Sequence, residues 1–230
     1  MKNKKVLILQ SNYIPWIGYF DLINSVDEFI IYDTVQYTRR DWRNRNKILV
    51  QQQEKWLSIP VKNKGNYHAN INQIEIEEGF NFNTHLESIK QAYKSYPFFM
   101  EISPKLERLF LSLKNKIFLT EINQIIITEL CHWLGIGTTI LRSENFHTQQ
   151  TKAAALIDIC KQTNASCYLT GPNGMNYIQE KDFESAYIQL DVFKYPNYAR
   201  ELPETNTGLS IIHLLMYYGI EKLKDVLIKK

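Results

Sequence analysis

The amino-terminal part of the chain contains two short apolar segments separated by a segment with helical spacing. Residues 6–10 and 29–32 are apolar enough to form buried strands, and Trp16, Phe20 and Ile23 have the spacing of one helix face. Two strands joined by a single helix pair in parallel through a right-handed crossover. This unit therefore predicts an α/β fold built on an open, mostly parallel sheet.

The rest of the chain returns to this alternation after a long helical segment. Apolar spacing predicts helices at 81–96, 105–116, about 120–134, 152–162, 209–218 and 221–228. Pro97 and Pro104 are expected to act as helix breakers. Further strands are expected at 55–61, 71–76, 139–142, 166–170 and 186–193, the first two as a small extension of the sheet or a hairpin. We expect a single α/β domain over residues 1–230 with a helical insertion at 80–135.

Polar side chains follow both amino-terminal strands. In an open parallel sheet, ligands bind beyond the carboxyl ends of the strands. Asn12, Tyr13 and Gln36 are therefore candidates for orienting the polar groups of a ligand. Asp33 comes directly after the second strand and is the candidate general base.

The first helix begins with aromatic residues around a glycine. Gly18 would let a ligand or another part of the backbone approach the first helical turn, whose amino terminus favours anions. Trp16 and Tyr19 are then candidate substrate-binding residues. The alternative is that Trp16 and Phe20 belong to the core and that Gly18 marks a tight contact between helix and sheet.

A glycine-containing turn follows the strand expected at 166–170. Gly171, Asn173 and Gly174 belong to it, and Tyr177 lies just beyond. No Lys-Ser or Lys-Thr follows, so the turn is not a Walker motif. A plain turn and a ligand-binding loop both remain open, and we include these four residues among the candidate substrate-binding residues.

Residues 36–47 (QYTRRDWRNRNK) carry much of the positive charge. The chain has a formal net charge of +3, and this segment holds five basic residues against one acidic residue. Guanidinium groups bind phosphates and carboxylates through paired hydrogen bonds, so Arg39, Arg43 and Arg45 predict a localised anion site, with Asn44 beside them. The alternative is a charged edge strand that prevents aggregation.

The remaining chemistry-bearing residues give weaker signals. The five histidines are scattered and predict no metal site. Ser210 and His213 lie at the start of a carboxyl-terminal helix, and we take Ser210 as a candidate substrate-binding residue and His213 as a candidate catalytic residue.

The cysteines and apolar tracts predict the compartment. Cys131, Cys160 and Cys167 are odd in number and form no Cys-x-x-Cys pair, which favours buried thiols in a reducing environment. The apolar stretch near the amino terminus is too short for a signal peptide. Longer apolar tracts are interrupted by polar residues or too short to span a bilayer. We therefore expect a cytoplasmic protein.

Five blocks of sequence resemble the WbqC-like protein family. They are QSNYIPWIGYFDLI (10–23), FIIYDTVQYTRRDWRNRNKI (29–48), WLSIPV (56–61), YLTGPNGMNYI (168–178) and GLSIIHLLMYYG (208–219). Members occur in bacterial gene clusters for O-antigen (lipopolysaccharide) and other surface polysaccharides, so the resemblance implies work on an activated sugar, with an amino sugar favoured. The family usually has a histidine before its Gln-Pro-Asn-Tyr block, where this chain has Leu9, and an acid where His213 stands.

A second resemblance is to nucleotidyltransferase-like, adenylate-forming enzymes such as pantothenate synthetase, whose sheet is Rossmann-like. The turn from Trp16 to Tyr19 stands in the place of their His-x-Gly-His signature, without its histidines. Those enzymes activate a carboxylate with ATP and pass it to an amine. The resemblance implies amide formation on an amino sugar.

These observations lead to one expected function and two alternatives. We expect a transferase that acylates or aminoacylates the amino group of a nucleotide-linked amino sugar, or an ATP-dependent amide-forming ligase. The donor stays open between ATP with an amino acid, acyl-CoA and an aminoacyl donor such as an aminoacyl-RNA, and a homodimer stays open. The alternatives are an RNA-binding module that uses residues 36–47, with Tyr37 and Trp42 stacking on bases, and an inactive scaffold of the same fold.

Overall fold

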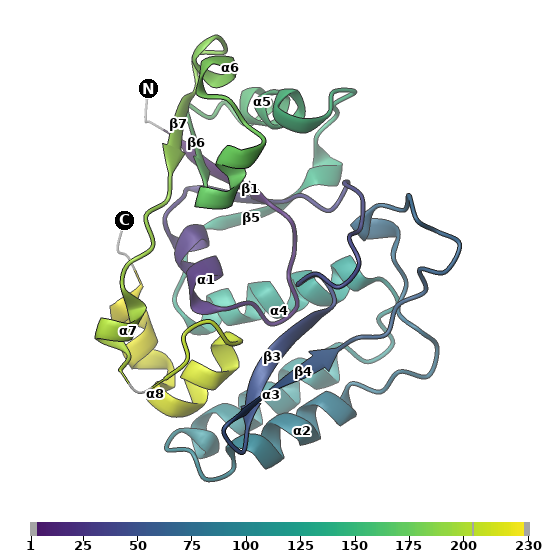
Figure 1. Cartoon of the computed structure of the whole chain (residues 1–230), viewed down its shortest axis with the longest axis vertical. Coiled ribbons are helices and arrows are strands. Elements are labelled where there is room, and N and C mark those ends of the chain that lie inside the picture. The colour runs from purple at the N-terminus through teal and green to yellow at the C-terminus, as the bar shows by residue number, and fades with distance from the viewer. Residues whose placement is uncertain (1–3, 204, 228–230) are drawn as a thin grey trace.

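The protein is built around a parallel sheet of five strands. The computed structural model describes residues 4–203 and 205–227, and the predicted helix end at residue 228 lies outside them. The strand order is β5-β2-β1-β6-β7, and every pair is parallel (Figure 1). The strands are β1 (Lys5–Leu9), β2 (Glu28–Ile31), β5 (Thr139–Arg142), β6 (Cys167–Thr170) and β7 (Gln189–Val192). The expected α/β class with an open parallel sheet is confirmed.

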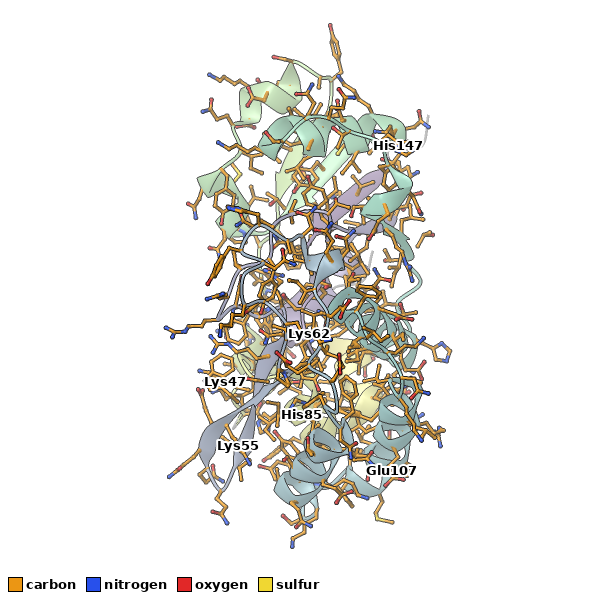
Figure 2. All side chains as sticks on the ribbon, turned by 90° about the vertical axis from the view of Figure 1, so that its right-hand side faces the viewer. Lys47, Lys55, Lys62, His85, Glu107 and His147 are labelled. Carbon is orange, nitrogen blue, oxygen red and sulfur yellow. The ribbon has the colours of Figure 1, made fainter. Side chains whose placement is uncertain are left out.

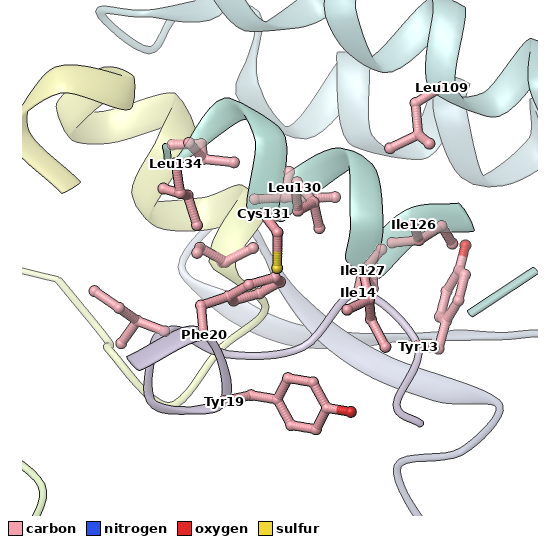
Figure 3. Close-up of a cluster of buried hydrophobic side chains, with 14 of the residues drawn as sticks. Tyr13, Ile14, Tyr19, Phe20, Leu109, Ile126, Ile127, Leu130, Cys131 and Leu134 are labelled. Carbon is pink, nitrogen blue, oxygen red and sulfur yellow. The ribbon is translucent and has the colours of Figure 1, made fainter. Parts of the chain in front are cut away.

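Helices cover both faces of the sheet. Helix α1 (Ile17–Asn24) joins β1 to β2 and packs in one core with α4 (Leu119–Trp133). Figure 3 shows Phe20 of α1 beside Cys131 and Leu130 of α4. The opposite face packs against α5 (Lys152–Gln162) and α6 (Glu180–Glu184). Successive strand side chains point to opposite faces, and the central strands are apolar because both faces are buried.

A long excursion separates β2 from β5. It contains a hairpin of β3 (Arg45–Val50) and β4 (Gln53–Ser58), a 3-10 helix η1 (Ile71–Gln73), α2 (Asn83–Tyr93), α3 (Phe99–Ser112) and α4. The segments 55–61 and 71–76 form neither the expected extension of the sheet nor the expected hairpin, and only one bridge joins them, between Val61 and Ile76. Gln51 and Gln52 form the hairpin turn with φ values of 48° and 63°. Glutamine is not a usual residue for that left-handed geometry, so the sequence carries no turn signal there.

The sequence predicts that Pro104 breaks a helix, but Pro104 lies inside α3. Proline removes one backbone hydrogen bond and strains the preceding turn. The same helix buries Ile102, Leu106 and Leu109 completely or nearly so. Packing of this apolar face outweighs the local cost of the proline.

The carboxyl-terminal elements follow the sheet. Helix α8 (Ile211–Val226) joins the two helices expected there across a kink at Gly219, whose φ is 76°. The remaining short elements are η2 (Ser143–Asn145), η3 (Pro172–Asn176) and α7 (Tyr198–Glu201). Among the described residues, no helix has the length and apolar character needed to cross a membrane.

Candidate functional site

The strand order creates a switch point between β1 and β6. From β1 the chain moves to β2 on one side, and it later returns to β6 on the other side of β1. The loops after these two strands therefore diverge at their carboxyl ends, where open α/β sheets bind ligands. Residues 10–12 and 171–174 meet this description.

Asp33 is the centre of a buried hydrogen-bond network at this edge. Its carboxylate accepts hydrogen bonds from the Ser11 amide at 2.9 Å, the Ser11 hydroxyl at 2.7 Å and the Thr120 hydroxyl at 2.5 Å. The side chain has no exposed surface. Burial raises the pKa of Asp33, although the hydrogen bonds and the nearby Arg43 oppose that shift. Asp33 thus ties the ends of β1 and β2 to the start of α4.

Arg43 joins the same network from the basic segment. Its guanidinium donates to the Ser11 carbonyl at 3.0 Å and to the Asn12 side-chain oxygen, and it lies 3.5 Å from Asp41. Only 8% of Arg43 is exposed. Its Nη1 group therefore holds the loop after β1, whereas the sequence suggests that Arg43 binds a phosphate of the ligand.

Two residues of the Asp33 network lie on α4 and were not identified as candidates from the sequence. Asn123 donates to the Ser11 hydroxyl at 3.0 Å and to the Arg43 carbonyl at 2.8 Å, and Thr120 donates to Asp33. Together with Gln124 they are buried polar residues on the otherwise apolar buried face of α4. Their three- and four-residue spacing on a buried helix face is the sequence pattern that could have identified them.

Tyr13 points away from the sheet edge. It is fully buried, and its hydroxyl forms a 2.8 Å hydrogen bond with the His85 ring on α2. Burial lowers the pKa of His85 to about 4, so this ring is neutral at physiological pH. The Tyr13 amide donates to the Trp42 carbonyl at 3.0 Å. This bond places the basic segment beside the loop after β1.

The start of α1 is covered by aromatic rings. A Cβ on Gly18 would lie 2.4 Å from the Trp16 ring and 2.8 Å from the Tyr195 ring, so only glycine fits. The rings of Trp16 and Tyr195 have centroids 5.1 Å apart. Tyr19 is buried and donates to the Gln10 carbonyl at 3.0 Å. Tyr195, which the sequence reasoning missed, joins Trp16 at this helix terminus.

The glycine-containing turn after β6 faces the same tyrosine. A Cβ on Gly171 would lie 3.4 Å from the Tyr195 hydroxyl, and one on Gly174 would lie 2.0 Å from the Thr170 hydroxyl. The turn forms the 3-10 helix η3, whose Asn173 is exposed, and Tyr177 beyond it is 74% exposed. The structure thus brings Gly18 and Gly171 to one ring at the switch point.

The other predicted residues of the basic segment have different partners. Gln36 donates to the Tyr67 carbonyl at 2.8 Å, and Asn44 donates to the Ile59 carbonyl at 2.7 Å. Both amides therefore fix the fold of the excursion. Arg39 and Arg45 each lie over an aromatic ring, and among the described residues neither has a carboxylate within ion-pair distance.

His213 and Ser210 lie in a different region. Ser210 is buried and caps α8 by accepting a hydrogen bond from the Ile212 amide at 3.3 Å. His213 packs against Tyr93 and Tyr96, with ring centroids 5.8 and 6.1 Å away. Burial lowers the pKa of His213 to about 4, and neither ring nitrogen has a partner among the described residues. No described contact joins His213 to the Asp33 network.

Two further features lie away from the switch point. A cavity of about 910 Å³ opens between residues 75–83 and residues 110–117, and no member of the Asp33 network lines it. Cys131, Cys160 and Cys167 are free and buried, and burial raises the pKa of each to about 12. In the part of the chain that the structure describes, no three histidine, cysteine, aspartate or glutamate side chains form a group that could hold a metal ion.

Comparison with known proteins gives one relative and one family model that each match most of the chain. The chain is 37% identical over 222 residues to the uncharacterized protein Rv1507c of Mycobacterium tuberculosis (strain ATCC 25618 / H37Rv), and the alignment covers 95% of each chain. No solved structure matches the chain. The family model of the WbqC-like proteins matches residues 10–225, so the chain belongs to the WbqC-like protein family.

Proposed function

We propose that this protein is a transferase that acylates or aminoacylates the amino group of a nucleotide-linked amino sugar during assembly of a bacterial surface polysaccharide. The observation that carries the proposal is the switch point between β1 and β6, where Gly18 and Gly171 approach Tyr195. Membership of the WbqC-like family supports the polysaccharide context. ATP-dependent amide formation is the variant of the same proposal in which the donor is activated on the protein.

The nucleotide is proposed to bind at the amino terminus of α1. Trp16 and Tyr195 supply flat apolar surface against which a nucleobase packs. The exposed Asn173 side chain supplies a donor for phosphate oxygens, and the amino terminus of α1 contributes the positive end of its dipole.

Asp33 is proposed to act through Ser11. In the transfer step the sugar amine attacks the acyl carbon, a C–N bond forms, the bond to the leaving group breaks with its electron pair, and the proton that the amine loses passes to the leaving group. Asp33 holds the Ser11 amide and hydroxyl, and Asn123 donates to the same hydroxyl. Ser11 itself is buried, so this arrangement fixes the loop after β1, where the half-buried Asn12 beside Ser11 orients the attacking amine. Asp33 is thus a positioning residue whose charge assists removal of the proton.

The test is a mass-spectrometric assay of purified protein. Nucleotide-linked 3-amino and 4-amino sugars are incubated with acyl-CoA, with ATP and amino acids, or with aminoacyl-RNA. We expect one combination to give a sugar product with the mass of an added acyl or aminoacyl group. No mass gain with any combination would contradict the proposal and favour an inactive scaffold.

The role of Asp33 is tested by the variant Asp33→Asn. Asparagine keeps an oxygen for the Ser11 amide but removes the charge, so we expect kcat to fall at least tenfold. We also expect kcat to rise with pH in the wild type and not in the variant. Asp182→Asn, an exposed aspartate on α6, is the matched control and is expected to leave the rate unchanged. A folded Asp33→Asn protein with the wild-type pH profile would contradict this role.

A further inference from the structure

We propose that the outer face of the β3–β4 hairpin and the adjoining loops bind single-stranded nucleic acid. We call this surface the aromatic–basic face, and its residues are Arg39, Arg40, Trp42, Arg45, Trp56 and Tyr67. The proposal rests on no part of the transfer reaction.

Strand alternation creates the outer face of the hairpin. Lys47 lies opposite Trp56 in the antiparallel register, so the two share one side of the hairpin. The intervening Asn46, Ile48 and Leu57 point inward and are buried. In Figure 2 the hairpin, which carries Lys47 and Lys55, lies at the left edge of the molecule, and α2 contacts the other side of β3. One side of the hairpin therefore packs on the protein while the other presents polar and aromatic groups.

Two tryptophans lie together on this face. The rings of Trp42 and Trp56 have centroids 5.4 Å apart at an interplanar angle of 37°, and the residues are 40% and 39% exposed. The chain has four tryptophans, and this pair leaves substantial ring surface in solvent. Exposed aromatic rings next to positive charge are the platforms on which unpaired bases stack.

Arginine side chains lie over the aromatic rings. The Arg45 guanidinium carbon is 4.2 Å from the Trp56 ring centroid, and that of Arg39 is 4.5 Å from the Tyr67 ring centroid. Arg39 Nη2 donates to the Asn63 carbonyl and Arg45 Nη2 donates to the Arg40 carbonyl, which leaves the Nη1 group of each arginine for phosphate oxygens. The aromatic–basic face thus contains two pairs, each made of one aromatic ring and one arginine.

The charge balance of the region favours a polyanion. Residues 36–67 contain eight basic and two acidic residues, whereas the rest of the chain contains 19 basic and 22 acidic residues. Of the two acidic residues, Asp41 contacts Arg43, and Glu54 contacts Lys47. Among the described residues, Arg39, Arg40 and Arg45 therefore have no carboxylate partner.

The repeated pairing favours an unpaired strand over other anions. A single nucleotide offers one base and would use one of the two pairs, and a duplex hides its bases from side chains. An anionic polysaccharide packs sugar rings rather than planar bases on tryptophan, and comparison with heparin separates the two ligands. The hydrogen bond from the Tyr13 amide to the Trp42 carbonyl places the face beside the loop after β1, so the end of a bound strand can reach the switch point.

The experiment measures binding of a short fluorescein-labelled oligoadenylate to the full chain by fluorescence anisotropy at several salt concentrations. Each phosphate contact contributes about 0.7 to the slope of log Kd against log salt for a single strand. We therefore expect the variant Arg39→Gln/Arg45→Gln to reduce that slope by about 1.4. The control Arg108→Gln/Arg200→Gln removes two exposed arginines elsewhere and is expected to keep the slope.

The stacking component is tested separately. We expect Trp42→Ala/Trp56→Ala to weaken binding at least tenfold with unchanged circular dichroism, whereas Tyr187→Ala, at a tyrosine that is 95% exposed, leaves binding unchanged. If the tryptophan variant unfolds, quenching of tryptophan fluorescence by oligoadenylate in the wild type, lost in Trp42→Phe/Trp56→Phe, provides the same test. Absence of oligoadenylate binding at low salt would overturn the proposal. Equal binding of heparin and oligoadenylate without fluorescence quenching would also overturn it.

Discussion

At the scale of single residues, two buried polar side chains have opposite surroundings. Both oxygens of the Asp33 carboxylate accept hydrogen bonds, from Ser11 and Thr120, so the charge of Asp33 is compensated within the protein. His213 is equally buried but lies among tyrosine rings, and its ring nitrogens lack partners among the described residues. The first arrangement positions a loop, whereas the second makes the protein sensitive to acid.

The burial of His213 predicts that the stability of the protein depends on pH. Its pKa is lowered from 6.5 to about 4, so the unfolded chain binds more protons than the folded protein between these values. The free energy of unfolding should therefore fall as pH drops from 6.5 towards 4, by up to about 1.4 kcal/mol per pH unit for this one group.

Urea unfolding at several pH values checks this expectation. His213→Leu removes the titrating group and suits the buried site, so its stability should depend less on pH across that range. His132→Asn changes an exposed histidine and should leave the wild-type dependence in place. A His213→Leu protein with the full wild-type pH dependence would show that the acid sensitivity comes from elsewhere.

At the scale of elements, the packing of α8 depends on one glycine. Gly219 has a φ of 76°, and a Cβ there would lie 2.5 Å from the Phe98 ring. Alanine would meet both backbone strain and a steric clash, so we expect Gly219→Ala to lower the free energy of unfolding by about 1–3 kcal/mol.

A second glycine provides the control for this prediction. Gly137 lies in the segment before β5, and a Cβ there would meet no atom within 4 Å. Gly137→Ala should therefore change the free energy of unfolding by less than about 0.5 kcal/mol in the same urea titration. Equal stability of the two variants would mean that the kink tolerates a side chain.

The elements also show which parts of the fold can be predicted from the sequence. Strands β1 and β2 were predicted closely because a short apolar run flanked by polar residues leaves few alternatives. The hairpin was misplaced because Gln51 and Gln52 give no turn signal, and α3 was shortened because Pro104 is normally a breaker. In both places tertiary packing decides the outcome and local preference does not.

The candidate site was predictable only in part. Residues directly after β1 and β2 could be placed at the sheet edge because parallel strands end together. Thr120 and Asn123 could not be placed, because only the folded excursion brings α4 against Ser11. Tyr195 was missed for the same reason, since its contact with Gly18 depends on how the chain continues after β7.

At the scale of the whole molecule, sheet order and charge distribution point to neighbouring parts of one edge. The order β5-β2-β1-β6-β7 places the switch point between two central strands. The excursion after β2 carries the excess positive charge and is tied to the loop after β1 by the bond between Tyr13 and Trp42. The central claim is that a nucleotide-linked amino sugar binds at the switch point.

A crystal structure of the protein with a nucleotide-linked amino sugar tests this claim most directly. The account predicts the nucleobase against Trp16 and Tyr195, the diphosphate at the start of α1, and the sugar amine near Asn12. Nucleotide bound only on the aromatic–basic face, with the start of α1 empty at saturating ligand, would contradict it.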